Sequence, residues 1–321
     1  MEDVIEPDLA ICDPHHHLWD FPTNRYLLHE FLADVGDGHR VESTVYVECG
    51  SFYRAEGPDH LKPVGETEFA AGQAAMAASD RYGPARVALG IVGHADMTTG
   101  DKVQETLAAH VEADPRRFRG VRHITAWDAS DKIHGHGVVT PQMLAQPAFR
   151  AGVAALGQFG LSFDAFVYHP QIEEVTALAT ALPDQTIVLD HIGGMVGIGP
   201  YAGKRDEIFP VWRAAIQELA KRPNVNVKLG GLGMTLCGFG FHKLPEPASS
   251  QVLADAWGPY IETCIEAFGA ERAMFESNYP MDSPACTYRT LWNAFKRLAQ
   301  GASADEKAAL FKGTAERVYR L

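Results

Sequence analysis

The sequence predicts an α/β protein of the (β/α)8, or TIM-barrel, class, with residues 1–321 forming a single domain. Two observations lead to this prediction. Short β-rich runs alternate with helical patterns along the whole chain, which is the order that a parallel sheet covered by helices requires. We count eight such runs without a break, which favours a closed barrel over an open doubly wound sheet. No GxGxxG or GxxxxGK[ST] motif follows an early run, which disfavours a nucleotide-binding sheet.

The strands are predicted from runs rich in β-branched and aromatic residues, and the helices from apolar residues three or four positions apart. A capping box, Ser303 with Glu306, marks the start of the last helix. The predicted strands are Leu9–His17, Glu42–Glu48, Arg86–Val92, Arg119–Ile124, Leu161–Tyr168, Thr186–His191, Asn224–Leu229 and Ala273–Asn278. The predicted helices are Gly65–Tyr82, Asp101–Ala113, Pro141–Phe159, Ile172–Leu182, Asp206–Lys221, Leu253–Phe268, Tyr288–Gln300 and Ser303–Arg320.

Composition restricts the partners and the compartment. The chain carries 28 basic and 41 acidic residues, a net charge of −13, and this field repels nucleic acid and anionic membranes. No run of about 18 apolar residues predicts a membrane helix, and the acidic N-terminus is unlike a secretory signal. The five cysteines form no CxxC pattern, so we expect reduced thiols and a cytoplasmic protein. A small-molecule substrate is the expected partner, and a homo-oligomer is left open.

Charged residues stand at the carboxyl ends of two predicted strands. In Thr44–Glu48 the valines share one face and Glu48 lies on the other, and Lys228 likewise alternates with valines in Asn224–Leu229. If the apolar faces meet the helices, Glu48 and Lys228 point toward the barrel axis. Barrel enzymes carry their catalytic groups at this end of the strands. Lys228 is therefore a candidate for binding a substrate carboxylate, with an internal ion pair as the alternative.

The first strand ends in a histidine pattern that is typical of a metal site. His15 and His17 alternate with His16, so they share one face with Cα atoms roughly 6–7 Å apart. Two imidazoles at that separation can converge on one ion. A second HxH, His134-Gly135-His136, follows no strand, and we interpret it as a rim or surface loop.

Three further runs end in polar residues. His191 ends the sixth run before two glycines, which predicts a titratable side chain at the barrel mouth, and His169 with Tyr168 follows the fifth. Arg122 lies in the fourth run; if it enters the barrel it needs an anionic partner, either a substrate carboxylate or Glu48. His169 and Arg122 are candidate catalytic groups, and Tyr168 and Arg122 are candidate substrate contacts.

The order of four motifs resembles a known family. Asp13 to Trp19, Gly120 to His123, Leu189 to Gly193 and Met274 to Pro280 are similar to the amidohydrolase-2 family of barrel hydrolases, in the branch of sugar lactonases and 2-pyrone-4,6-dicarboxylate lactonases. The resemblance covers the chain from Ile11 to the C-terminus. It implies hydrolysis of a lactone by activated water, with His15, His17 and His191 as metal ligands.

The resemblance fails at one position. Family members usually carry an aspartate, a metal ligand or general base, where this chain has Asn278; Asp282 lies four residues on. We therefore take Asp282 or Glu48 as the base, Asp282 as the fourth metal ligand and Asn278 as a substrate contact. One divalent metal is expected, with zinc the first choice and manganese tolerated, although a metal-free mechanism stays open.

Two other functions remain open from the sequence. One is a metal-dependent decarboxylase or amide hydrolase on the same barrel. The other is a non-catalytic ligand-binding barrel that has lost its base, which Asn278 supports. Substrate specificity is expected from two loops, Cys49–Pro63 and Leu232–Ser250.

Overall fold

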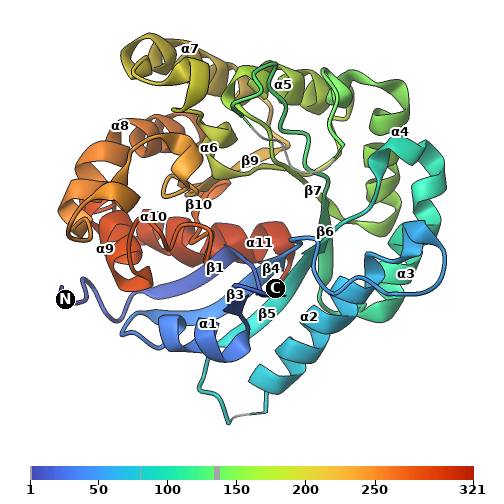
Figure 1. Ribbon diagram of the computed structural model, residues 1–321, viewed down its shortest axis with the longest axis horizontal. Helices are drawn as coiled ribbons and strands as arrows, with labels where there is room; N and C mark the ends of the chain where they lie inside the picture. The colour runs from blue at the N-terminus through green and yellow to red at the C-terminus, as the bar shows by residue number, and fades with distance from the viewer. Residues whose placement is uncertain (1, 80, 134–137) are drawn as a thin grey trace.

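The structure is a computed structural model that describes residues 2–79, 81–133 and 138–321. Eight parallel strands follow one another around the sheet in chain order, with helices outside them (Figure 1). The barrel closes where His16 pairs with Tyr279 and where the Asn278 amide donates to the His15 carbonyl at 2.9 Å. The (β/α)8 prediction is confirmed. The strands are β1 (Ala10–His16), β4 (Arg40–Val47), β5 (Arg86–Gly93), β6 (Phe118–Arg122), β7 (Ser162–Ala165), β8 (Ile187–Leu189), β9 (Val225–Leu229) and β10 (Ala273–Phe275).

Several strands end earlier than predicted, and the polar residues that follow leave the sheet. β10 ends at Phe275 and β8 at Leu189, so Asn278 and His191 lie in the connections above the barrel. His191 opens a short turn labelled α6 (His191–Gly194), in which His191 itself has a positive φ of 54°. Residues beyond the end of a strand no longer alternate between the two faces of the sheet, so their side chains can turn toward the mouth of the barrel.

The prediction that the valines of the second barrel strand face the helices is wrong. Val45 and Val47 pack with Cys12, Val92, Val188, Met274 and Tyr319, one cluster drawn from several strands and the C-terminal helix. Such a cluster can form only inside the barrel. Tyr46 instead faces outward, where its hydroxyl donates to Glu66 of α2 at 2.8 Å. Glu48 reaches the barrel mouth because it lies past the end of β4.

The helices cover the barrel as expected, with some differences in their bounds. The helix predicted at Pro141–Phe159 is wrong as one helix, because Gln142 adopts a positive φ of 54° and η3 (Met143–Ala145) precedes α4. The helix predicted from Asp101 starts as a 3-10 turn, η2 (Met97–Val103). The helices are α2 (Val64–Ala77), α3 (Gln104–Ala113), α4 (Pro147–Ala155), α5 (Ile172–Ala181), α7 (Arg205–Leu219), α8 (Ser250–Phe268), α9 (Tyr288–Leu298), α10 (Ala304–Ala308) and α11 (Thr314–Tyr319).

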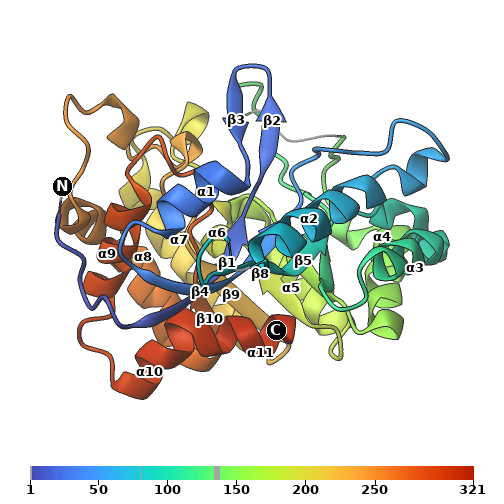
Figure 2. The same cartoon turned by 90° about the horizontal axis from the view of Figure 1, so that it is seen from below.

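A hairpin and a short helix between β1 and β4 were not predicted from the sequence. A short hairpin, β2 (Trp19–Phe21) and β3 (Asn24–Tyr26), leads into α1 (Leu28–Val35). Figure 2 shows the hairpin standing above the barrel, on the side opposite α10 and α11.

The C-terminal segment predicted as one helix, Ser303–Arg320, is not one helix, because a π-helical turn, η10 (Ala309–Gly313), separates α10 from α11. The capping box of Ser303 and Glu306 is confirmed. None of the helices in the described residues is long and apolar enough to cross a membrane.

Candidate active site

A cavity of about 1020 Å³ opens at the carboxyl ends of the strands. Its walls include at least one side chain from the end of seven strands: His17, Glu48, His94, Arg122, Phe166, His191 and Asn278. Parallel strands of a barrel all end on the same side, which brings these residues together although they lie far apart in the sequence. Trp19, Phe21 and Asn24 of the hairpin add to the wall. The histidines at residues 134 and 136 lie outside the described residues.

The first-strand histidines divide between the two faces of β1. His15 and His17 lie on the inner face with ring centroids 4.9 Å apart, whereas His16 stacks on Phe31 of α1 on the outer face. The Nδ1 of His17 donates to the Val47 carbonyl at 2.8 Å, so in the neutral ring Nε2 carries no proton and is an acceptor. His17 lines the cavity, and His15 is completely buried beneath it.

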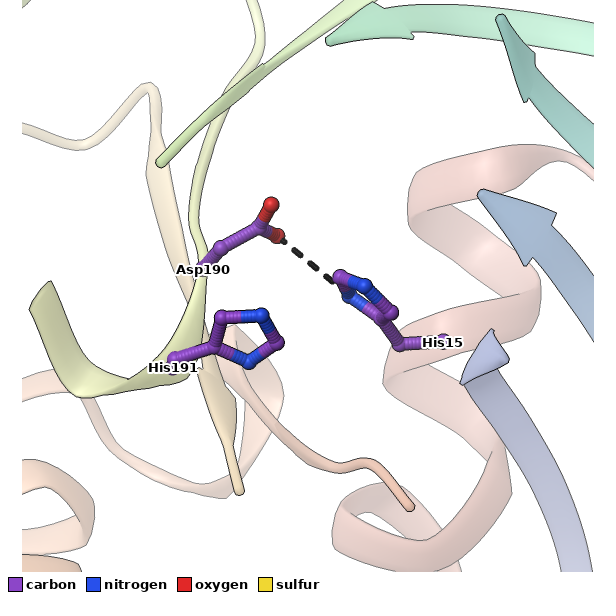
Figure 3. Close-up of side chains that lie close together, drawn as sticks. All are labelled: His15, Asp190 and His191. Carbon is purple, nitrogen blue, oxygen red and sulfur yellow. Dashed lines mark ion pairs between the residues drawn. The ribbon is translucent and has the colours of Figure 1, made fainter. Parts of the chain in front are cut away.

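His15, Asp190 and His191 form a compact cluster at the base of the cavity (Figure 3). Each offers one potential ligand atom, and these atoms all lie within 4.8 Å of one another. The Glu276 carboxylate joins the two rings, since Oε1 lies 2.6 Å from His191 Nδ1 and Oε2 lies 2.9 Å from His15 Nδ1. All of these side chains are buried, so their orientation is fixed by one another and not by solvent.

Two buried cations contact this cluster. Lys228 Nζ lies 3.0 Å from Asp190 Oδ1, 2.8 Å from Asp164 Oδ2 and 3.1 Å from His15 Nδ1. Arg122 Nη1 lies 3.3 Å from His15 Nε2. A guanidinium and an ammonium can only donate, so each ring nitrogen of His15 faces a cationic donor, and Nδ1 also lies beside the Glu276 carboxylate.

These charges shift the pKa values of His15 and Asp190. Burial and the Lys228 cation hold the pKa of His15 well below its ordinary value, so its ring is neutral at neutral pH. Burial alone would raise the pKa of Asp190, but Lys228, His191 and Arg122 bring it below its ordinary value.

Arg122 and Glu48 form the ion pair that the sequence left as one of two alternatives. Arg122 Nε donates to Glu48 Oε1 at 2.7 Å, and Nη2 donates to the Glu48 carbonyl. Burial lowers and the Glu48 charge raises the pKa of Arg122, with a net upward shift. Both residues line the cavity. Glu48 and Asp96 are the two carboxylates on the described part of its wall, and Glu48 is the one beside Arg122.

The donor set fits a divalent metal ion. Two imidazoles and a carboxylate are ligands that zinc prefers. In the part of the chain that the structure describes, the four buried carboxyl groups of Glu48, Asp164, Asp190 and Glu276 share two cationic side chains, Arg122 and Lys228, so a further cation would be favourable. His17, which the sequence also suggested as a ligand, lies outside the group within 4.8 Å, as does Asp282.

Asn278 and Asp282 form a pair in which only the first residue reaches the cavity. Asn278 Nδ2 donates to Asp282 Oδ1 at 2.8 Å, and the Gly233 amide donates to Asp282 Oδ2 at 2.9 Å. Burial raises the pKa of Asp282 to about 7. Asp282 is completely buried, so it contacts the cavity through the Asn278 amide.

Three other predicted residues lie away from the described cavity wall. Lys228 lies beneath it in the internal ion pair that the sequence left as its alternative role. His169 accepts a hydrogen bond from the Val196 amide at 3.2 Å, and Tyr168 packs with Ala126, Ile133, Phe166 and Val196. These contacts hold the connection after β7 and give neither side chain a place on the described wall.

Sequence reasoning missed three buried acids and two cavity histidines. Asp190 precedes His191, and Glu276 lies two residues before Asn278, so both were adjacent to predicted site residues. Asp164 lies inside a predicted strand, and a single acid in a buried strand indicates a buried cation or hydrogen-bond donor beside it. His94 and His123 follow β5 and β6 and line the cavity.

Comparison with known proteins places the chain in a family. The family described as Amidohydrolase matches residues 12–321. An uncharacterized protein, y4mH, of Sinorhizobium fredii strain NBRC 101917 / NGR234 is 34% identical over 98% of this chain and 99% of its own length. An L-fucono-1,5-lactonase of Burkholderia ambifaria is 26% identical over 96% of this chain and 95% of its own.

Solved structures show the same fold. A Burkholderia multivorans amidohydrolase crystallised with bound zinc has a TM-score of 0.74 and 24% identity, covering 97% of this chain and 99% of its own. A putative 2-pyrone-4,6-dicarboxylic acid hydrolase of Pseudomonas putida has a TM-score of 0.60 and 19% identity, covering 97% and 98% of the two chains.

Proposed function

From the membership of this chain in the amidohydrolase family of hydrolases, we propose that it opens the lactone ring of a small carboxylated or sugar-derived substrate. The observation that carries the proposal is the convergence of Glu48, Arg122 and His191 on one cavity at the barrel mouth. The full-length L-fucono-1,5-lactonase relative supports the choice of a cyclic ester.

Glu48 acts as the general base in this proposal. It is the wall carboxylate next to Arg122, so a water bound between Glu48 and a substrate carbonyl can lose its proton to the carboxylate. The oxygen of that water bonds to the carbonyl carbon, and the bond to the ring oxygen breaks. The proton then passes from Glu48 to the ring oxygen as it leaves as an alcohol. Water is the only co-reactant.

Arg122 stabilises the negative charge that develops on the carbonyl oxygen. Its guanidinium is buried and held by Glu48, so little reorganisation is needed when the charge appears. Asn278 lines the same cavity, and because its amide nitrogen donates to Asp282, its amide oxygen is the group that would accept from the substrate or the water.

A divalent ion, zinc first, would be held by His15, Asp190 and His191. When bound, it supplies Lewis-acid polarisation and lowers the pKa of water. The neutral state of His15 suits this role, because an imidazole binds metal only when it has lost a proton.

The proposal is tested by incubating the purified protein with five- and six-membered lactones, including L-fucono-1,5-lactone and 2-pyrone-4,6-dicarboxylate. We expect proton release and a product that has gained one water. Carbon dioxide release from an aromatic acid, with no lactone opened, would instead identify a decarboxylase. Binding of lactones without turnover would identify a ligand-binding barrel.

A further inference from the structure

Two histidines of the cavity wall have no part in the proposed reaction. His94 follows β5 and His123 follows β6, and both line the cavity. Their ring centroids lie 5.2 Å apart with the planes inclined by 62°. They come from neighbouring strands, so they form one patch of the wall, next to Arg122.

The backbone fixes the proton on the His94 ring. Its Nδ1 lies 3.2 Å from the Arg122 carbonyl oxygen, which can only accept, so Nδ1 donates. In the neutral ring Nε2 is then an acceptor. The His94 carbonyl accepts from His110 Nε2 at 2.9 Å, and His110 Nδ1 contacts the Thr67 hydroxyl at 2.8 Å. The Arg122 carbonyl therefore holds the His94 ring, and the His110 ring holds the His94 backbone.

The backbone fixes the opposite arrangement on His123. The Met97 amide donates to His123 Nδ1 at 3.1 Å, so Nδ1 accepts and the neutral ring carries its proton on Nε2. Burial and His94 lower the pKa of His123 to about 4, although the Asp96 carboxylate at 3.8 Å, the Glu48 carboxylate and the Ala95 backbone act in the other direction. The ring is thus neutral at neutral pH.

We propose that His94 and His123 are a specificity-determining pair that reads a hydroxyl group of the substrate, or two neighbouring hydroxyls, with His123 Nε2 donating and His94 Nε2 accepting. A hydroxyl both donates and accepts, so it satisfies both rings. A carboxylate offers no proton to His94, and an ammonium offers no acceptor to His123. The inference rests on the proposed function and narrows it to lactones that carry hydroxyl groups.

The pair is joined to the reacting groups through one residue. The Arg122 carbonyl holds His94, and the Arg122 guanidinium holds Glu48. A substrate hydroxyl bound by the histidines would therefore orient the ring relative to the base. A lactone without hydroxyls would leave both ring nitrogens unpaired in a partly desolvated wall, which lowers its transition-state binding.

The test compares aldono-1,5-lactones with δ-valerolactone, which has the same ring without hydroxyls. We expect wild type to prefer at least one aldonolactone by about 100-fold in kcat/KM, and His94→Phe or His123→Phe each to reduce that preference about tenfold. His94→Gln keeps an acceptor and should restore part of it. His60→Phe, an exposed histidine paired with Glu105, is the matched control and should leave it unchanged.

Two results separate this inference from the proposed function. If lactones are opened but the phenylalanine variants keep the wild-type preference, the pair reads no hydroxyl and the inference is overturned while the hydrolase proposal stands. If no lactone is opened, calorimetric titration with the corresponding aldonates decides the inference. Binding that weakens about tenfold or more in both variants supports it, and absent or unchanged binding overturns it.

Discussion

Glu276 is the side chain that organises the base of the cavity. One oxygen contacts His191 Nδ1 and the other contacts His15 Nδ1, so a single carboxylate sets both ring orientations. Acids that orient ligand histidines in this way sharpen a metal site and raise ligand basicity. Asp190 stands beside the two rings as the third donor.

This geometry predicts the effect of Asp190→Asn on metal content. The purified wild-type chain should carry stoichiometric zinc or another divalent ion by elemental analysis. The variant should lose most of it, because an amide is a weaker ligand and the charge that attracts the cation is gone. Asp96→Asn, which changes a wall acid outside the cluster, should retain it. Equal metal content in Asp190→Asn and wild type would show that the cluster is not the site.

At the residue scale, local motifs predicted part of the cluster. The alternation of His15 and His17 placed both on the inner face, and His191 was predicted at the barrel mouth, where it lines the cavity just beyond the end of β8. Asp190 and Glu276 could not be assigned, because their roles depend on contacts with His15, which lies far from both in the sequence. The role of Asn278 could not be assigned either. Its partner Asp282 is only four residues away, but the Asp282 carboxylate is held by the amide of Gly233, which lies far away in the sequence.

At the element scale, α2 fixes the loop that follows β4. Glu66 accepts from the Tyr46 hydroxyl at 2.8 Å and from the Cys49 and Ser51 amides at 2.8 and 3.2 Å. These contacts hold the turn just after Glu48. Burial and the nearby Glu48 carboxylate raise the pKa of Glu66 to about 7, compared with an ordinary value of 4.5.

This shift makes the stability contribution of Glu66 depend on pH. The folded state binds the proton more tightly than the unfolded state, so the contribution is fully present below pH 4.5 and is lost as pH rises to about 7. We expect the unfolding free energy of wild type, relative to Glu66→Gln, to fall by about 3 kcal/mol between pH 4.5 and 8. Urea unfolding at the two pH values measures it.

Glu246→Gln, a change at an exposed residue, is the control for this comparison. A difference between wild type and Glu66→Gln that stays constant over this pH range would contradict the raised pKa.

Helix signals were most informative where the chemistry is local. The capping box of Ser303 and Glu306 was found in the sequence because both partners lie within one turn. The break at Gln142 was missed, since no glycine or asparagine marks its positive φ. The β2–β3 hairpin was missed because each strand has only three residues.

At the scale of the whole molecule, the C-terminal helix closes the lower end of the barrel. The Tyr319 hydroxyl of α11 donates to Asp164 at 2.6 Å, and Asp164 in turn holds Lys228 beneath the cavity. All three side chains are completely buried. The end of the chain therefore supports the base of the site from below.

Tyr319→Phe should destabilise the protein by about 1–3 kcal/mol, because a buried carboxylate loses one of its donors. Urea unfolding at neutral pH measures the effect. Tyr82→Phe, a partly exposed tyrosine in edge contact with His29, should change stability by much less. Equal stability of Tyr319→Phe and wild type would mean that this hydrogen bond contributes nothing net.

The barrel itself could be predicted because its signal repeats eight times along the chain. Each βα unit adds the same pattern, so errors in single bounds do not alter the class. The inward packing of Val45 and Val47 could not be predicted, because alternation gives two faces without saying which one meets the barrel axis.

The central claim is that Glu48, on the wall of the cavity, activates water for lactone opening. The most direct measurement is proton release from the lactones that wild type opens, recorded side by side with Glu48→Gln, which keeps the shape of the side chain. We predict that kcat/KM falls by about 100-fold or more while the fold is retained by circular dichroism. A variant that opens lactones at the wild-type rate would contradict the claim and remove Glu48 from the reaction.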